Sequence, residues 1–172
     1  MNFELCLADM SDAEKIYKLM KSVYEGLEDK SLFFCDDLDY VKEHINESGF
    51  AVKVECEGLI VASLITRFPN ECEDNLGRDI GLKDCKLCKV AHLESIVVDE
   101  KYRGFRLQDK LIKYAEKLVY EKGYKYVMAT VSPDNTYSLN NFKKNGFEVV
   151  CVKEKYGGLI RAVLVKGNDL QF

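Results

Sequence analysis

Several features that define special classes of protein are missing from this sequence of 172 residues. It contains only two prolines and no stretch of low complexity, so we expect little disorder. No apolar run approaches the roughly 18–20 residues that are needed to span a bilayer. The 25 basic and 29 acidic side chains are interspersed, without the basic stripe that is typical of nucleic-acid binders. We therefore expect neither a membrane nor a nucleic acid as a partner.

A secretion signal is also missing. The N-terminal sequence Met-Asn-Phe-Glu-Leu-Cys does not begin a basic segment followed by an apolar one. Seven cysteines without such a signal indicate reduced thiols, and their odd number argues against a complete disulfide framework. We expect a cytoplasmic protein that folds as one domain over residues 1–172, as a monomer or a homodimer.

The order of hydrophobic patterns predicts a mixed α/β sheet. Alternating or continuous apolar residues indicate strands at 3–7, 51–54, 59–65, 90–98, 126–131, 147–152 and 159–165, with a hairpin turn at Glu57-Gly58. Helical spacing indicates helices at 12–26, with Ser11 as N-cap, and at 36–46, 106–122 and 135–145. Because a helix joins the strands 90–98 and 126–131, we expect these two strands to pair in parallel.

Residues 68–89 form a polar insertion without a clear period. Its one helical piece, Leu76 to Leu82, is interrupted by glycines. A connection of this length in a compact domain is either functional or mobile.

Cysteines in this insertion suggest a metal site as an alternative. Cys85 and Cys88 have the pair spacing of a structural zinc site, with Cys72 upstream and His92 downstream. The second half of such a ligand set is irregular, however. Coincidence in a cysteine-rich chain explains the pattern better, and we expect no metal.

The run from Val97 to Gln108 carries the most chemical information. A buried strand ends there, a charged turn follows, and Arg103-Gly104 precede an amphipathic helix. Unpaired N–H groups at a helix start, the helix dipole and a nearby arginine favour an anion such as a pyrophosphate. The alternative is an ordinary strand–loop–helix junction. A nucleotide P-loop and a dinucleotide site are disfavoured, because neither glycine pattern is present.

This run resembles motif A of the GNAT family of N-acetyltransferases, whose usual form is Arg/Gln-x-x-Gly-x-Gly/Ala after a strand that ends in valine. In that family the loop and the helix start hold the pyrophosphate of coenzyme A, and the strand edge pairs with the pantetheine arm. The resemblance implies that the pantetheine amides lie along Ile96, Val97 and Val98. It places the phosphates along Arg103, Gly104, Phe105, Arg106, Leu107 and Gln108.

Two of these positions depart from the family's pattern. Arg106 and Gln108 stand where glycine or alanine is usual. Glycine permits a close backbone approach, so the side chain of Arg106 has to turn away from the phosphates or wrap around them. Gln108 fits a first helical turn.

A second motif supports the resemblance. The run 131–135, followed by Ser138, Phe142 and Gly146-Phe147, is similar to motif B of the family. This similarity implies that Asn135, Ser138 and Phe142 contribute to the coenzyme site. Together the motifs imply the GNAT fold, a mixed α/β sheet of about seven strands that splays between the fourth and fifth strands, flanked by about four helices.

Glu94 is our candidate for the catalytic base. It lies beside the expected thioester and resembles the glutamate that the family often has there. Its apolar neighbours would desolvate the carboxylate and raise its pKa toward the useful range. The alternative is an ordinary polar residue of an alternating strand. His92 points to the same face and could share the base role or bind substrate, although a polar strand histidine is commoner.

The catalytic acid is harder to identify. Many family members have a tyrosine at the position of Phe142, which cannot donate a proton. Tyr137 is our candidate instead, and Tyr156 is a second. The thiolate could also leave without a dedicated acid, because thiols are already fairly acidic.

The resemblance implies an N-acetyltransferase that moves an acetyl group from acetyl-CoA to a primary amine of a small molecule or protein. Transfer would be direct, within a ternary complex. One alternative is a domain that binds or senses coenzyme A without turnover, which the unusual Arg106 and the missing tyrosine suggest. Another is an interaction protein that binds through residues 68–89. The acceptor is not readable, because this fold builds acceptor pockets from variable helices and loops.

Overall fold

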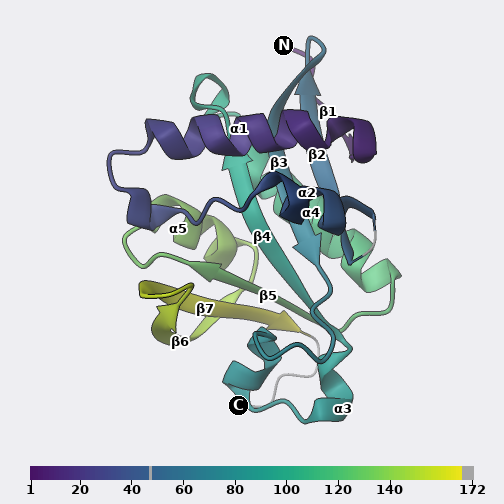
Figure 1. The fold of residues 1–172 in the computed structure, drawn as a ribbon, viewed down its shortest axis with the longest axis vertical. Coiled ribbons are helices and arrows are strands. Elements are labelled where there is room, and N and C mark those ends of the chain that lie inside the picture. The colour runs from purple at the N-terminus through teal and green to yellow at the C-terminus, as the bar shows by residue number, and fades with distance from the viewer. Residues whose placement is uncertain (47, 168–172) are drawn as a thin grey trace.

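The computed structural model describes residues 1–46 and 48–167. A seven-stranded sheet in the order β1-β2-β3-β4-β5-β7-β6 forms the centre of this part of the chain (Figure 1). Its strands are β1 (Glu4–Leu7), β2 (Gly49–Cys56), β3 (Leu59–Arg67), β4 (Val90–Val98), β5 (Tyr126–Val131), β6 (Glu148–Lys155) and β7 (Leu159–Gly167). The helices are α1 (Ala13–Gly26), α2 (Leu38–Asn46), α3 (Asp84–Leu87), α4 (Leu107–Glu121) and α5 (Thr136–Lys144), with 3₁₀ helices at Met10–Asp12, Lys30–Leu32, Leu76–Ile80 and Glu100–Tyr102. The predicted mixed α/β class is confirmed.

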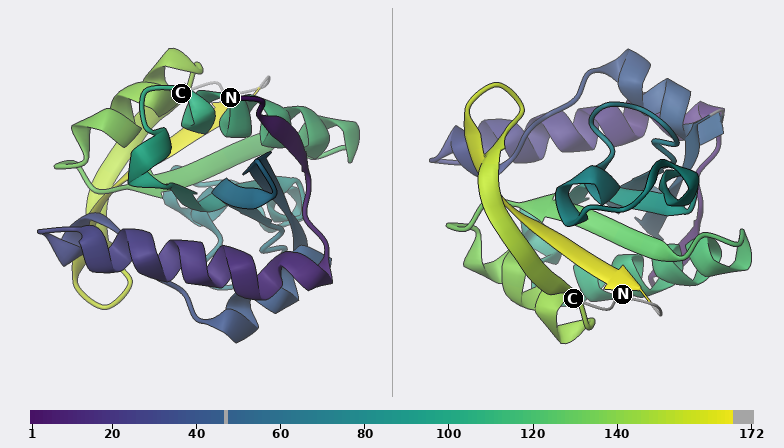
Figure 2. Two further views of the ribbon diagram at one scale, coloured as in Figure 1. Left: turned by 90° about the horizontal axis from the view of Figure 1, so that it is seen from above. Right: turned by 90° about the horizontal axis from the view of Figure 1, so that it is seen from below.

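Helices cover both faces of the sheet. Figure 2 shows α1 on one face and α4 with α5 on the opposite face. Leu111 and Ile112 of α4 are fully buried in one core cluster, and Ile16 and Met20 of α1 in another. The apolar stripes of the sequence form these helices because each stripe is the face that packs on the sheet. Within the described ranges, no helix is long and apolar enough to cross a membrane.

Two helices begin later than the sequence pattern predicts. Ser11 does not cap α1: its N–H donates to the carboxylate of Asp9 at 2.8 Å, and this bond starts a 3₁₀ turn that precedes α1. Likewise, the carboxylate of Asp37 accepts the N–H of Tyr40 at 2.8 Å, and α2 begins only at Leu38. A capping aspartate therefore sets both starts, since Asp9 caps the 3₁₀ turn before α1 and Asp37 caps α2.

The strands β4 and β5 separate partway along their length. They pair in parallel from Val90 opposite Tyr126 to Leu93 opposite Ala129. Beyond that point β4 pairs with β3 and β5 pairs with β7. Figure 1 shows the two strands diverging from their shared end. The predicted splay between the fourth and fifth strands is therefore confirmed.

A β-bulge in β4 decides which side chains face this opening. Ile65 pairs with Glu94 and Ser63 with Val97, so β4 carries one extra residue in the interval. Ser95, within the bulge, has a φ of 48°. In a regular strand, the side chains of Glu94 and Val97 would point to opposite faces. Because of the bulge, both point to the side of the sheet that α1 and α2 cover.

Residues 68–89 fold onto the end of the sheet where β4 and β5 are paired. Leu76 and Leu87 are buried, and Leu76 packs with Val90 and Met128. The predicted helical piece is the 3₁₀ helix Leu76–Ile80, which ends at Gly81 with a φ of 70°. Apolar contacts with the sheet thus hold a segment whose sequence has no period of its own.

Gly49 of β2 lies too close to β3 to accept a side chain. An added Cβ would lie 1.8 Å from the carbonyl oxygen of Thr66. We expect Gly49→Ala to lower the free energy of unfolding by about 1–3 kcal/mol, the usual cost of overpacking. Gly26→Ala is the matched control, since nothing lies within 4 Å of its Cβ and a helix favours alanine. Urea denaturation measures both variants, and wild-type stability of Gly49→Ala would contradict the prediction.

Candidate active site

Two adjoining cavities open where β4 and β5 separate. The helix-start cavity, of about 430 Å³, lies between β4, the start of α4 and the connection from α1 to α2. The Glu94 cavity, of about 270 Å³, holds Glu94 and lies between β4, β5 and the β6–β7 turn. The residues that line both cavities are Leu32, Phe33, Ile96, Asn135 and Ser138. The cavities therefore meet at Ile96 on β4.

Most of the residues predicted to hold coenzyme A line the helix-start cavity, namely Ile96, Val97, Val98, Arg103, Gly104, Leu107, Gln108, Asn135 and Ser138. Three lie elsewhere. Phe142 is buried and lines the Glu94 cavity. The ring of Phe105 packs 5.2 Å from that of Phe3, outside both cavities. Arg106 also lies outside both linings, and its side chain is 76% exposed.

The conformation of Arg106 explains how it replaces a glycine. Its φ of 59° lies in the left-handed region, which glycine favours. The exposed side chain turns toward Asp109, with 3.3 Å between Nη2 and Oδ2. The backbone before α4 therefore keeps the form that a glycine would give it, and the arginine points to solvent rather than into the cavity.

Gln108 links α4 to α5. Its Nε2 donates to the hydroxyl of Ser138 at 2.8 Å, and its Oε1 accepts from Asn141 at 2.9 Å. Asn135 caps α5 by accepting the N–H of Ser138 at 3.1 Å. The residue that departs from the usual alanine or glycine thus joins the two motif segments into one wall of the helix-start cavity.

The edge of β4 that faces β5 carries no strand partner from Glu94 to Val98 within the described residues. Backbone N–H and C=O groups on such an edge are a template for an extended ligand. The start of α4, a helix of 15 residues, lies at the end of this edge and beside Arg103. An extended chain that ends in an anion fits this arrangement.

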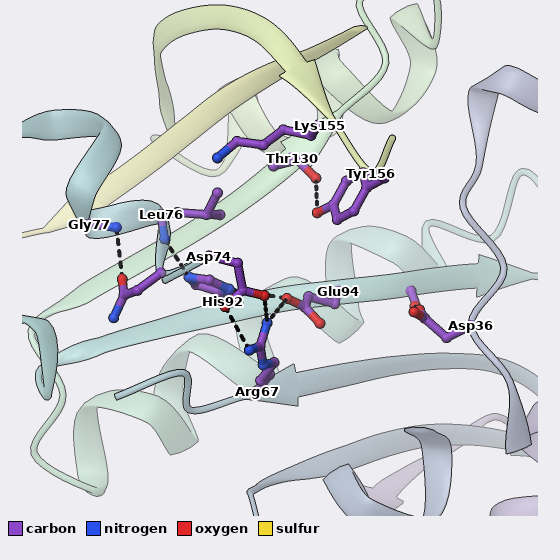
Figure 3. A network of polar contacts seen from close by, with 12 residues as sticks. Asp36, Arg67, Asp74, Leu76, Gly77, His92, Glu94, Thr130, Lys155 and Tyr156 are labelled. Carbon is purple, nitrogen blue, oxygen red and sulfur yellow. Dashed lines mark hydrogen bonds and ion pairs between the residues drawn. The ribbon is translucent and has the colours of Figure 1, made fainter. Parts of the chain in front are cut away.

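Three groups surround the carboxylate of Glu94, and Figure 3 shows two of them, His92 and Arg67. The hydroxyl of Tyr40 on α2 donates to its Oε2. Oε1 lies 3.1 Å from Nδ1 of His92 and 3.8 Å from Nη1 of Arg67 at the end of β3. The side chain of Glu94 is 17% exposed, so one part of the carboxylate still reaches the cavity.

The insertion holds this network in place. The N–H of Leu76 donates to Nε2 of His92 at 3.1 Å, which leaves Nδ1 as the nitrogen that donates to Glu94. Asp74 binds the guanidinium of Arg67 through two bonds of 2.6 and 2.9 Å. Residues 68–89 therefore orient two of the partners of Glu94. His92 is 2% exposed and both of its ring nitrogens are engaged. It therefore orients Glu94, and neither nitrogen is free to accept a proton from a substrate.

The expected rise in the pKa of Glu94 is wrong. Burial alone would raise that pKa, as the apolar neighbours in the sequence suggest. The bonds from His92 and Tyr40 and the charge of Arg67 outweigh burial, however, and the pKa of Glu94 is lowered. Tyr40 and Arg67 are far from Glu94 along the sequence, so only His92 could have been associated with it before the structure was known.

The surroundings raise the pKa values of two groups next to Glu94. Burial and the nearby charge of Glu94 raise the pKa of Asp36. The hydrogen bond from Ser95, at 2.6 Å, lowers it but is outweighed. Burial and the adjacent carboxylate of Glu94 raise the pKa of Tyr40. Tyr40 thus stays protonated at neutral pH and donates to Glu94.

The two candidate acids lie in different cavities. Tyr137 lines the helix-start cavity and is 61% exposed. Tyr156, in the β6–β7 turn, lines the Glu94 cavity, and its hydroxyl lies 2.8 Å from that of Thr130. Burial raises the pKa of Tyr156 to about 12. The ring of Tyr156 stacks on that of Phe34 at 5.1 Å, so the turn and the α1–α2 connection meet beside the cavity.

Sequence reasoning missed several polar residues that line the Glu94 cavity, among them Asp36, Tyr40, Arg67 and Arg161. Arg67 gave one signal, since it is a charge at the end of an apolar strand. The others had none, because Asp36 and Tyr40 looked like helix surface residues and Arg161 like an outward residue of an alternating strand. Only their packing against β4 and β5 places them at the site.

The cysteines of the insertion do not join His92 in a metal site. Among the residues that the structure describes, no group of three or more His, Cys, Asp or Glu side chains could hold a metal ion. Cys72, Cys85 and Cys88 are exposed free thiols, whereas His92 is buried beside Glu94.

The geometry of the splayed strands, the helix start and the buried glutamate agrees with the comparison to known families. Residues 13–147 match the model of the acetyltransferase (GNAT) family. The chain belongs to the GNAT family. No curated protein matches the chain.

Solved structures agree on the fold of this GNAT protein. The ribosomal-protein-S18-alanine N-acetyltransferase from Escherichia coli is 14% identical with a TM-score of 0.71, over 99% of this chain and 100% of that one. yncA from Salmonella typhimurium, solved with its cofactor acetyl-CoA, is 14% identical with a TM-score of 0.70, over 100% and 97%. The aminoglycoside acetyltransferase AAC(6')-Ib, in complex with coenzyme A and kanamycin, is 16% identical with a TM-score of 0.70, over 96% and 95%. At these identities the likeness shows the fold alone.

Removing the hydroxyl of Tyr40 tests the charge balance at Glu94 in this GNAT protein. Because that hydroxyl donates to the carboxylate and stabilises its charged form, we expect Tyr40→Phe to raise the pKa of Glu94. Carbon-13 NMR of the labelled glutamate carboxyl groups measures the shift. Tyr24→Phe, on α1 and outside both cavities, is the matched control. An unchanged or lower pKa in Tyr40→Phe would contradict the assigned bond.

Proposed function

We propose that this GNAT protein moves an acetyl group from acetyl-CoA to a primary amine, of a small molecule or a protein, by direct attack within a ternary complex. The observation that carries the proposal is that the helix-start cavity and the Glu94 cavity meet at Ile96. A thioester that lies along β4 would present its carbonyl carbon at this meeting point. An amine in the Glu94 cavity would then reach this carbon directly. Holding both reactants in one site lowers the barrier to their reaction.

The donor side of the proposal rests on the helix-start cavity. Backbone N–H groups at the start of α4 and the side chain of Arg103 would hold the pyrophosphate. The unpaired edge of β4 would take the pantetheine amides as an added strand. Solved members of this fold with acetyl-CoA or coenzyme A bound support the choice of donor.

In the proposed step, the amine nitrogen attacks the carbonyl carbon of the thioester and a tetrahedral intermediate forms. The carbon–sulfur bond then breaks and leaves the N-acetyl product and the thiolate of coenzyme A. The proton of the amine passes to Glu94, and the hydroxyl of Tyr156 protonates the thiolate. Solvent then takes the proton from Glu94 and returns one to Tyr156, which balances the cycle.

The lowered pKa of Glu94 limits how it acts. The carboxylate is ionised at neutral pH, but it is too weak a base to deprotonate a free ammonium of pKa near ~10. The amine therefore has to enter the site in its neutral form. Glu94 takes its proton as the carbon–nitrogen bond forms, when the nitrogen becomes acidic.

Glu94→Gln tests the base, because it keeps the shape of the side chain and removes the charge. We expect kcat to fall by about 10²–10⁴-fold, the usual contribution of general-base catalysis. Release of free thiol from acetyl-CoA across a panel of amines measures turnover, and Glu14→Gln, exposed on α1, is the matched control. Calorimetry should find acetyl-CoA binding retained, since Glu94 lies outside the helix-start cavity. A wild type that binds acetyl-CoA but acetylates no amine would instead support a sensing domain.

A comparison of two tyrosine variants tests the acid. The hydroxyl of Tyr156 lies in the Glu94 cavity and its raised pKa keeps it protonated, so we expect Tyr156→Phe to lower kcat by about 10-fold or more. Tyr137→Phe removes the same hydroxyl group from the other cavity and should cost less. Steady-state kinetics with one amine at fixed pH decides between them. The reverse order of effects would assign the acid to Tyr137.

A further inference from the structure

Arg161 lies on β7 at the wall of the Glu94 cavity and has no role in the proposed transfer. It is 3% exposed, and the next residue, Ala162, pairs with Val131 of β5. The guanidinium lies over the ring of Tyr156, with 6.0 Å from its central carbon to the ring centroid. A buried arginine thus lies beside the candidate acid in the wall of the Glu94 cavity.

The hydrogen-bond capacity of this arginine is not filled. Nη1 donates to the carbonyl of Ile160 at 2.9 Å. Nη2 is buried and has no hydrogen-bond partner among residues 1–46 and 48–167. Within the same ranges, no carboxylate forms an ion pair with Arg161. Burial also lowers the pKa of its guanidinium, as expected for a charge without a counterion.

The other charged groups of the cavity are already engaged. Arg67 forms two bonds to Asp74. Glu94 accepts from Tyr40 and His92, and the carboxylate of Asp36 accepts from Ser95. Since an arginine stays charged and a buried charge without a partner is costly, the vacant Nη2 calls for an anion that enters the cavity from outside.

We propose that Arg161 binds a carboxylate of the acceptor, so that the substrate presents a primary amine and a carboxylate within one small group. This inference rests on the proposed function and names its substrate class. The planar guanidinium matches the geometry of a carboxylate and fixes its orientation. The carboxylate end is held at β7 while the amine end points to Glu94 on β4 and to the thioester at Ile96. A cavity of about 270 Å³ suits a molecule of amino-acid size.

Two sources supply this chemistry. One is a free amino acid, and the other is a peptide whose first residue has an acidic side chain. Both present an amine and a carboxylate within one small group. Two sets of substrate pairs separate these sources. Each free amino acid is compared with its amide, and each peptide that begins with aspartate is compared with the same peptide beginning with asparagine.

The experiment measures kcat/KM with acetyl-CoA for each pair in the wild type, in Arg161→Met and in Arg161→Lys. We expect the wild type to prefer the carboxylate member, and Arg161→Met to reduce that preference by about 10- to 100-fold, as for a lost bond to a charged group. Arg161→Lys should retain part of it, because it keeps the charge without the planar geometry. Comparison of each ratio between variants cancels differences in the pKa of the amines. Lys117→Met, on the exposed surface of α4, controls for the loss of one positive charge.

Several outcomes would overturn the proposal. One is an equal loss for both members of each pair, which would make Arg161 a packing residue beneath Tyr156. Another is a preference for a dicarboxylic acyl-CoA that disappears in Arg161→Met, which would place the anion on the donor. If Arg161→Met does not fold, Arg161→Lys carries the comparison.

The failure of this inference is distinguishable from that of the proposed function. If acetyl-CoA binds but no amine is acetylated, the proposed transfer is wrong. Calorimetry of amino acids and their amides, titrated into the complex with coenzyme A, still tests Arg161. Binding of the carboxylate form that weakens in Arg161→Met would support the site, and equal binding of both forms would overturn it.

Discussion

The separation of β4 from β5 after Leu93 is the constraint on which the site depends. Parallel pairing ends at Leu93 and Ala129, and each strand then follows its other neighbour. This divergence leaves one edge of β4 without a strand partner among the described residues, opens the Glu94 cavity between the two strands and leaves the helix-start cavity beside β4. The bulge at Ser95 rotates the strand at that point, so Glu94 faces the opening together with the side chains of α2. Without the divergence, β5 would cover the edge of β4 that we propose as the binding site of the donor.

A second constraint is the charge balance around Glu94. Burial would make its carboxylate a stronger base, but the donors that hold it in place stabilise its charge and lower its pKa. The protein thus favours a fixed and ionised carboxylate over a more basic one. Residues 68–89 contribute to this balance, because Leu76 orients His92 and Asp74 holds Arg67. Arg161 is the exception, since its Nη2 has no hydrogen-bond partner among the described residues.

Much of the fold could be predicted from the sequence. A strand or helix that buries one face has apolar residues at a regular spacing in its sequence, and this spacing is readable. The glycines at 58, 123 and 146 take left-handed conformations in the turns that follow such elements. The helices begin at Ala13 and Leu38, slightly later than the predicted Asp12 and Asp36, because Asp9 caps a 3₁₀ turn before α1 and Asp37 caps α2. Arg106 shows the reverse case, because it stands where glycine is usual and still takes the left-handed conformation that glycine favours.

The sequence by itself determined the α/β class, the helix that follows Arg103-Gly104 and the position of Glu94 on a strand, because these depend on local spacing, and its motifs implied the splayed sheet through their resemblance to the GNAT family. Only the tertiary structure decided what surrounds Glu94. Tyr40, Arg67 and Arg161 come from three separate elements, and no local pattern records that they share a cavity. The tertiary structure also decided the direction of the pKa shift at Glu94, because that depends on donors distant in sequence whose effect exceeds that of burial.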